Sequence, residues 1–417
     1  MATSRGILLC CLALSTVRCS LLLDPTIHSD QDTKAQVDTA AGSSDAAGTG
    51  KLSGPPKVGF VYVGPVGDHG WTLTHDLSRK YLESKVPGIE TSFAPSVSAV
   101  DAPAVIDDLL EQGHNVIVGT SYDFLVPVQS KAANNPGAQF LICSGFVTSP
   151  NLGSYFGRMY QVKWMAGQLA GRMTRTNRIG IVGPVVIPET VRHINAFTMG
   201  VRAVNPDAVV HVRWVNAWFA PDEEAAATKA LVDAGADIIL GSTDTTVPLE
   251  VSSTLKASDG GPVYSIGYDN PDSCKFAPKT CMASAYWNWG PLLARILGQM
   301  VDGTWDSTDP IWEQMKSDPK ESIVYLSEMN TDIVPTATRL EIEGLIPKLA
   351  EPGVKGQQLP FPGPIKDTAG KERLGAGKQF TDAELLRMCW FVQGVVGDDV
   401  DGKPTPGVVP GSCPGDK

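Results

Sequence analysis

Polar and aromatic side chains gather just after the first apolar run of the chain. Asp68, His69, Trp71 and Thr72 follow residues 57–63 (KVGFVYV) in a glycine-flanked turn that opens a helix. A carboxylate beside an imidazole could form an acid–base pair, but an Asp in such a turn more often caps the helix or bonds a ligand. We therefore expect capping or ligand contacts rather than catalysis here.

The same arrangement recurs after four later apolar runs, at the ends where open α/β sheets place ligand sites. The further candidates are Ser121 and Tyr122, Asn216 and Trp218, Asp244, and Asp269. Both later aspartates could accept hydrogen bonds from ligand N–H or O–H groups, and Asp269 could instead cap its turn. One Trp at a strand end is usually core, but two at converging ends could stack on a flat ring.

These positions depend on strand-like runs that alternate with helix-like segments. The runs are residues 57–63, 115–120, 139–145, 178–183, 209–215, 237–241 and 263–268, and the helical patterns include 103–112, 161–173, 188–204, 221–234 and 248–257. Such alternation predicts an α/β fold with parallel sheets covered on both faces. The strands are too many for one small sheet, and residues 173–178 are a plausible crossing between two.

Composition and motifs exclude several functions. The 417 residues are 42% hydrophobic, enough for two domains, and a net charge of −11 argues against nucleic-acid binding. The chain has no G-x-S-x-G elbow, Walker loop, H-E-x-x-H helix or G-x-G-x-x-G fingerprint. No Cys or His pair has zinc-site spacing with a matching second pair. We expect no metal, no cofactor and no enzyme.

The N-terminus reads as a targeting segment. Arg5 precedes a short apolar stretch, residues 6–17, and Cys19 follows. We expect lipid attachment at Cys19 after signal cleavage, although Arg18 stands where a bacterial lipoprotein signal has a small residue. Plain cleavage and an uncleaved anchor remain alternatives. Residues 29–56, rich in Asp, Thr, Ala, Ser and Gly, predict a flexible tether.

Export would permit disulfides. Cys274 and Cys281 bracket a short loop and are expected to pair, with two free thiols as the alternative. A bond between Cys389 and Cys413 is a weaker prediction. Cys143, inside an apolar run, reads as a buried thiol.

Four segments carry a family resemblance. They are KVGFVYVGPVGDHGWTLTHDLSRK, VNAWFAPDEEAAATKALVDAGADIILGSTD, YSIGYDNPDSCKFAPKTCMASAYWNWGPLLARILGQMVDGTW and PFPGPIKDTAGKERLGAGKQFTDAELLRMCWFVQGVVG. From residue 57 to 397 the chain resembles the basic membrane protein (BMP) family, substrate-binding lipoproteins of ABC transporters related to purine nucleoside receptors. The resemblance implies a type I periplasmic-binding fold, two doubly wound lobes that close on a ligand.

The resemblance also implies a division of the chain and places for the crossings between lobes. Residues 1–19 are expected to form the signal segment, 20–55 the tether, 56–173 with about 282–323 the first lobe, 174–281 with about 324–400 the second lobe, and 401–417 an irregular tail. The crossings are expected near residues 173–178, near 281–287 and after Val324.

By the same resemblance, Asp68 and Trp71 match the acidic and aromatic residues of the nucleoside-binding members, while Thr72 replaces their Asn. Trp218 corresponds to the stacking aromatic of the second lobe, and Asp269 to the aspartate that holds ribose hydroxyls. Where those receptors have a lysine, this chain has Trp287, followed by Asn288. The lost cation makes a nucleobase a competitor of a nucleoside.

The resemblance therefore implies a monomeric solute receptor of the cell envelope, anchored to a membrane through lipid, facing the periplasm. It would pass a purine-type ligand to the permease subunits of an ABC transporter. Two alternatives stay open: an envelope enzyme resembling nucleoside hydrolases, in which Asp68 and Asp269 would supply carboxylates, and a sensory receptor on the same fold.

Overall fold

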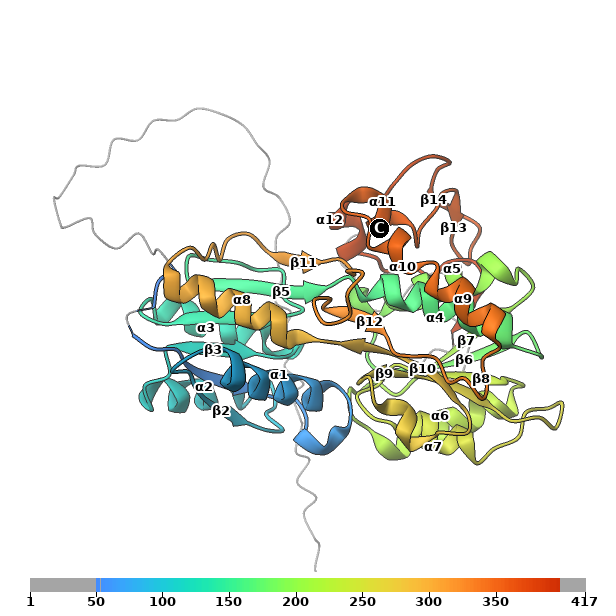
Figure 1. Ribbon diagram of the computed structural model, residues 1–417, viewed down its shortest axis with the longest axis horizontal. Coiled ribbons are helices and arrows are strands. Elements are labelled where there is room, and N and C mark those ends of the chain that lie inside the picture. Colours follow the sequence, from blue (N-terminus) through green and yellow to red (C-terminus); the bar gives the residue numbers. More distant parts are fainter. Residues whose placement is uncertain (1–49, 53, 398–417) are drawn as a thin grey trace, which may run out of the picture. The chain divides into compact units, whose positions relative to one another are not determined.

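The computed structural model describes residues 50–52 and 54–397 (Figure 1). The expected signal segment, the lipid attachment at Cys19, nearly all of the tether and the tail 401–417 lie outside the described residues. The predicted pairing of Cys389 with Cys413 also involves a residue outside them.

Within residues 50–52 and 54–397, none of the helices combines the length and the apolar character that spanning a membrane would require.

The first sheet has six strands in the order β11-β5-β4-β3-β1-β2, and every neighbouring pair is parallel. The strands are β1 (Lys57–Val61), β2 (Glu90–Ala94), β3 (Val116–Gly119), β4 (Gln139–Cys143), β5 (Leu152–Gly157) and β11 (Ile311–Glu313). Successive residues of β3 pack in different buried clusters: Val116 and Val118 belong to one cluster and Ile117 to another. The sheet is therefore covered on both faces, as its continuous apolar strands predict.

Four helices cover this sheet. They are α1 (Trp71–Lys85) and α8 (Trp289–Asp302), which pack on each other, and α2 (Ala102–Glu111) and α3 (Leu125–Asn134). Leu82 and Ile296, from α1 and α8, share the cluster of Val118. Ile106 and Val128, from α2 and α3, pack with the other cluster. Two 3-10 turns, η1 (Val66–Asp68) and η2 (Tyr122–Phe124), follow β1 and β3.

The second sheet has seven strands in the order β12-β10-β9-β8-β6-β7-β15. They are β6 (Arg178–Gly183), β7 (Val209–Trp214), β8 (Ile238–Gly241), β9 (Tyr264–Asp269), β10 (Cys281–Trp287), β12 (Val324–Leu326) and β15 (Val395–Gly397). All pairs are parallel except β10 with β12. Helices α4 (Met159–Met173) and α5 (Pro188–Val204) share one buried cluster with this sheet, and α6 (Pro221–Asp233) shares another. Helix α7 (Val247–Ser253) packs on α6, β8 and β9.

The two helices α4 and α5 approach very closely, and glycines permit it. A Cβ added to Gly167 of α4 would lie 2.0 Å from the carbonyl oxygen of Phe197, and one added to Gly200 of α5 would lie 2.1 Å from that of Trp164. No side chain fits at either position. The backbone contact fixes α5, whose first turn reaches the ligand site described below.

The remaining described elements follow β12. They are α9 (Thr336–Glu343), α10 (Ile346–Leu349), α11 (Val354–Gln358), the hairpin β13 (Ile365–Lys366) and β14 (Glu372–Leu374), and α12 (Asp382–Leu386); η3 (Ser273–Phe276) lies earlier, after β9. Gly344 and Leu345 separate α9 from α10.

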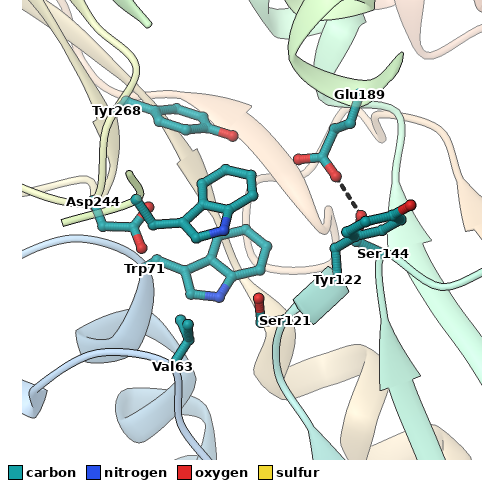
Figure 2. A pocket seen from close by; sticks show the side chains of 9 residues that line it. Val63, Trp71, Ser121, Tyr122, Ser144, Glu189, Asp244 and Tyr268 are labelled. Atoms are coloured by element: carbon teal, nitrogen blue, oxygen red, sulfur yellow. Dashed lines mark hydrogen bonds between the residues drawn. The ribbon is translucent and has the colours of Figure 1, made fainter. Parts of the chain in front are cut away.

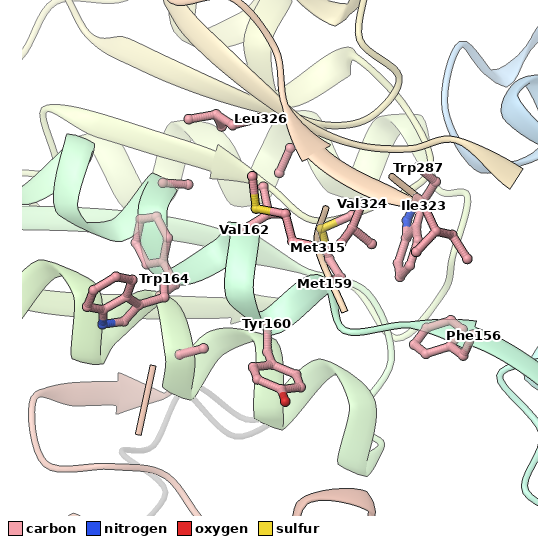
Figure 3. Packing of buried hydrophobic residues seen from close by; sticks show 14 of the residues in the cluster. Phe156, Met159, Tyr160, Val162, Trp164, Trp287, Met315, Ile323, Val324 and Leu326 are labelled. Carbon is pink, nitrogen blue, oxygen red and sulfur yellow. The ribbon is translucent and has the colours of Figure 1, made fainter. Parts of the chain in front are cut away.

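The chain passes between the two sheets three times: between β5 and α4 near Arg158, between β10 and α8 at Asn288, and between β11 and β12 at residues 314–323. The first crossing precedes the expected residues 173–178, the second directly follows the expected residues 281–287, and the third precedes Val324 rather than following it. Helix α4 packs on α5 rather than on the first sheet's helices, and β10 pairs throughout with β9. Near these crossings the two sheets share one core, in which Phe156, Met159, Trp287 and Val324 all lie buried (Figure 3).

The predicted α/β fold with two parallel-dominated sheets is confirmed. Each of the seven predicted strands is present within two residues of its expected bounds. Two further strands of the first sheet were not predicted: β2, which is largely half-exposed, and β5, in which two glycines interrupt the apolar pattern.

Candidate functional site

A small cavity, partly open to solvent, lies where strands of both sheets end. It is lined by Val63, Trp71, Ser121, Tyr122, Ser144, Glu189, Trp218, Asp244 and Tyr268 (Figure 2). The first five residues follow β1, β3 and β4 of the first sheet; the other four lie on or after β6, β7, β8 and β9 of the second. Both sheets therefore contribute their carboxyl ends, the edge that binds ligands in open α/β folds.

Trp71, the first residue of α1, is held rigidly in the cavity wall. Its indole Nε1 donates a hydrogen bond of 2.7 Å to the carbonyl oxygen of Thr120, and its ring meets Trp289 edge-on at 5.4 Å between centroids. Only 8% of the residue is exposed. The indole therefore has a fixed position in the cavity wall, and a ligand that contacts it would cost little rotamer entropy of this side chain.

The carboxylate of Asp68 binds the first turn of the same helix. It accepts backbone hydrogen bonds from Gly70 at 2.9 Å, Thr72 at 2.7 Å and Leu73 at 3.0 Å. Burial raises the pKa of Asp68, and these hydrogen bonds oppose the rise. The side chain satisfies amides that the first turn of a helix leaves unpaired, and it does not line the cavity.

Trp218 comes from the loop between β7 and α6, on the second sheet. The peptide carbonyl of Trp218 accepts a hydrogen bond of 2.9 Å from the amide of Asp244, so the two loops are tied together. Asn216, two residues earlier, does not line the cavity but shares an adjoining recess with Trp218 and Asp244.

Asp244 is a buried carboxyl group in the cavity wall, only 3% exposed. Among the described residues, no group donates a hydrogen bond to its side chain. Burial, and then the charges of Asp269 and Asp68, hold the pKa of Asp244 well above its usual range. The group therefore favours its neutral form, which can donate one hydrogen bond and accept another.

Asp269 lies behind the cavity rather than in its wall. It is completely buried, and its Oδ1 accepts a hydrogen bond of 3.1 Å from the indole Nε1 of Trp287. Burial raises the pKa of Asp269 well above its usual range, while the charge of Lys163 opposes this shift. Its buried Oδ2 has no hydrogen-bond partner among the described residues, and the role in holding ribose hydroxyls stays a prediction.

The other predicted candidates also lie away from the cavity lining. Trp287 stacks on Trp289 with centroids 4.5 Å apart and planes at 12°. Asn288 donates to backbone carbonyls of the segment 319–322, so it holds the chain at a crossing. His69 is exposed and contacts Phe276, and Thr72 is completely buried.

Left-handed backbone marks the turns around the site. His69, Ser144, Asn216 and Asp269 all have φ between 56° and 65°. Non-glycine residues adopt this region at a cost, and such residues concentrate at binding sites. Each follows a strand whose carboxyl end faces the cavity region.

The cavity thus brings together five of the predicted residues: Trp71, Ser121, Tyr122, Trp218 and Asp244. Seven lie elsewhere: Asp68, His69, Thr72, Asn216, Asp269, Trp287 and Asn288. Four lining residues were missed. Ser144 follows a predicted strand and Tyr268 ends one, so the strand-end rule could have found both. Val63 and Glu189 carried no comparable signal.

A buried lysine was also missed. The Lys163 ammonium lies 3.3 Å from the ring centroid of Tyr268 and donates to Ser242 at 3.1 Å. Burial lowers the pKa of Lys163 to about 7, against the charges of Asp269 and Glu189. The sequence shows only a lysine within an amphipathic helix. The structure places a cation directly behind the cavity wall, although Trp287 occupies the lysine position of the nucleoside receptors.

The structure tests the predictions for three cysteines of the described region. Cys274 and Cys281, the pair expected to form a disulfide, are joined. Cys143 is buried with a free thiol. Within the described ranges, no group of three or more Cys, His, Asp or Glu residues could hold a metal ion.

Two mainly parallel sheets whose strand ends line one cavity are the arrangement of an α/β solute-binding protein. Residues 56–335 match the family model Bmp, described as ABC transporter substrate-binding protein PnrA-like, and the chain belongs to this family. Membership implies a small-molecule ligand, permease partners and a place outside the cytoplasm. Proteins of this family bind solutes and are not enzymes.

Two relatives carry names that differ in ligand. A purine-binding protein of Brucella abortus is 37% identical over 342 residues, which cover 81% of this chain and 92% of that protein. A protein of Haloferax volcanii, named as an ABC transporter glucose-binding protein, is 34% identical over 62% of this chain and 64% of its own length. The names of these two relatives therefore point to different ligands.

Solved structures agree on the fold. A solute-binding protein of an ABC transporter from Conexibacter woesei aligns with a TM-score of 0.55 at 19% identity, covering 72% of this chain and 99% of that one. One from Aeropyrum pernix aligns with a TM-score of 0.58 at 19% identity, covering 73% and 83%. The expected type I periplasmic-binding fold is confirmed.

Proposed function

We propose that this protein captures a purine-type ligand between its two sheets and delivers it to the permease of an ABC transporter. The observation that carries the proposal is that Trp71 and Trp218, one from each sheet, line the same cavity. Two indoles on opposite sides of a slot can stack on both faces of a flat heterocycle, each adding about 1 kcal/mol beyond the area they bury.

The polar groups of the cavity suit such a ring. Asp244 can donate and accept at once in its neutral form, which matches a purine edge that carries an amine beside a ring nitrogen, or a carbonyl beside an N–H. The name of the Brucella abortus relative supports the same ligand class. Glucose, named for the Haloferax volcanii relative, is the competing ligand that the test must include.

We propose in addition that each sheet with its helices forms a lobe, and that the lobes open and close on the ligand about the three crossings. Two polar contacts join the sheets beside the cavity in this structure. The amide of Asn270 donates to the carbonyl of His69 at 3.1 Å, and the Ser144 hydroxyl donates to Glu189. These contacts support a closed form.

We further propose a lipid anchor at Cys19 and a monomeric receptor facing the periplasm. Cys19 lies outside the described residues, so the proposal depends on the sequence pattern alone. Expression of Cys19→Ser beside the parent tests the anchor: the parent should fractionate with membranes and the variant should not. Equal membrane retention of both would rule out acylation at Cys19.

The experiment that tests the ligand is a thermal-shift screen of the protein against adenine, guanine, hypoxanthine, their nucleosides, pyrimidines, glucose and amino acids. A ligand that binds only the folded state adds about 2.7 kcal/mol at a hundredfold excess over its Kd. We expect shifts with purines alone, and chromatography should recover each ligand unchanged. A shift with glucose alone would reject the purine ligand, and release of a base from a nucleoside would instead indicate a hydrolase.

A further inference from the structure

Glu189 is a carboxylate of the cavity wall that the sequence analysis did not single out. It lies in the first turn of α5, is only 6% exposed, and faces the cavity from the second sheet. In Figure 2, Glu189 and Asp244 lie on opposite sides of the Trp71 indole. The cavity therefore has one carboxyl group on each side of this indole.

The contacts of Glu189 leave one oxygen for a ligand. The Ser144 hydroxyl, from the first sheet, donates to Oε2. Among the described residues, no other group donates a hydrogen bond to this carboxylate. Two buried cations, Arg192 and Lys163, act on it: burial raises the pKa of Glu189, while the Ser144 hydrogen bond and these two charges oppose the rise.

The two carboxyl groups are not equivalent. Burial raises the pKa of both, but the charges beside them differ: nearby carboxylates raise the pKa of Asp244 further, whereas Arg192 and Lys163 oppose the rise at Glu189. Because Ser144 donates only to Oε2, the other oxygen of Glu189 is available as an acceptor. A ligand that fits both needs a donor beside an acceptor at one end and a donor at the other. The 6-amino edge of adenine supplies the first pair, and an unsubstituted imidazole N–H supplies the second donor.

We propose that Glu189 is a specificity-determining residue that accepts a hydrogen bond from the imidazole N–H of a free purine base, so that the site prefers nucleobases to nucleosides. The proposal rests on the purine function proposed above and deepens it. Asp269, the carboxylate expected to hold ribose, does not line the cavity, and its Oδ1 accepts from Trp287. A sugar bonded to the imidazole nitrogen replaces the hydrogen that would be donated to Glu189.

The test is isothermal titration of the full-length protein with adenine, 9-methyladenine and adenosine. 9-Methyladenine keeps the ring and the amine but lacks the imidazole N–H. We expect the parent to bind adenine at least about tenfold more tightly than either of the other two, since a hydrogen bond to a charged group is worth about tenfold or more.

Two variants separate ligand contact from cross-sheet contact. Glu189→Gln should weaken adenine binding about tenfold but change 9-methyladenine binding less than about threefold. Ser144→Ala keeps the carboxylate and removes only its bond across the sheets, so it should weaken both ligands by the same factor. Equal weakening of both ligands by Glu189→Gln would show that Glu189 acts only through Ser144, and would overturn the proposal.

The parent titrations decide the case even if a variant does not fold. Adenosine bound as tightly as adenine would overturn the nucleobase preference and leave the purine function standing. No binding of any purine, with binding of glucose, would overturn both.

Discussion

The indole of Trp287 donates a hydrogen bond of 3.1 Å to Oδ1 of Asp269, and both residues lie behind the cavity wall. One oxygen of the aspartate that family resemblance assigns to ribose is thereby bonded to a side chain of the neighbouring strand, while Oδ2 has no partner among the described residues. Trp287 in turn stacks on Trp289, which meets Trp71 edge-on. A chain of aromatic contacts thus links Asp269 to the cavity without placing it there.

Asp269→Asn should therefore leave adenine affinity within about threefold of the parent. The amide keeps an acceptor for the Trp287 indole, and the residue does not line the cavity. Isothermal titration gives the Kd. A loss of more than about tenfold would mean that Asp269 reaches the ligand, as in the nucleoside receptors.

Trp218→Ala should abolish purine binding with little loss of stability. The residue lines the cavity and is only half-buried, so its removal takes away a stacking face without opening a core cavity. Binding is followed by titration and stability by urea unfolding. Phe219→Ala is the matched control, because Phe219 is the adjacent aromatic, 42% exposed and outside the cavity lining. A Trp218 variant that binds normally but unfolds easily would identify a core residue instead.

Asp68→Ala should destabilise the protein by about 1–2 kcal/mol, since the first-turn amides of Gly70, Thr72 and Leu73 lose their acceptor. Urea unfolding measures the change. Asp68→Asn keeps one acceptor oxygen and should fall between the parent and Asp68→Ala. If both variants are as stable as the parent but fail to bind adenine, Asp68 contacts the ligand and its capping role is secondary.

His75 should make the protein sensitive to acid. Its ring is completely buried between Trp71 and Trp289, and desolvation lowers the pKa of His75 to about 3. The unfolded chain takes up the proton near the ordinary pKa of 6.5, so stability is lost as the pH falls from 6.5 toward 3. Between pH 7 and pH 5 the loss from this residue is about 2 kcal/mol.

Urea unfolding at pH 7 and pH 5 measures that loss. His75→Gln should be less stable than the parent at pH 7, because the ring contacts are gone, but should lose about 2 kcal/mol less between the two pH values. His69→Gln alters an exposed histidine and should leave the parent's difference unchanged. An identical pH dependence in the parent and His75→Gln would show that His75 is protonated in the folded protein.

Sequence patterns predicted the strands well because buried parallel strands are continuous apolar runs. They predicted five cavity residues for a related reason: the carboxyl ends of parallel strands lie at one edge of a sheet. That rule does not say which side chain turns inward. His69 and Trp71 are two residues apart, yet one is exposed and the other lines the cavity.

Tertiary packing determines the side-chain positions that sequence patterns did not predict. Lys163 reaches the cavity wall only because α4 packs on the second sheet's side, after the chain has already crossed at Arg158. The residues of α4 have an ordinary helical composition, so nothing in them indicates that the chain has crossed to the second sheet. Likewise, whether Asp269 faces a ligand or an indole depends on β10, a strand that follows β9 only after the disulfide-closed turn.

Strands of the two sheets alternate along the chain, and this order determines whether the protein can be divided into separate fragments. The first sheet is completed by β11, which is synthesised after five strands of the second sheet, and β12 and β15 follow later still. Neither sheet therefore corresponds to one continuous fragment. A protease cut at Arg158 would leave α8 and β11 on the C-terminal piece, still packed on the N-terminal piece, so the nicked protein should stay assembled until denaturant separates it.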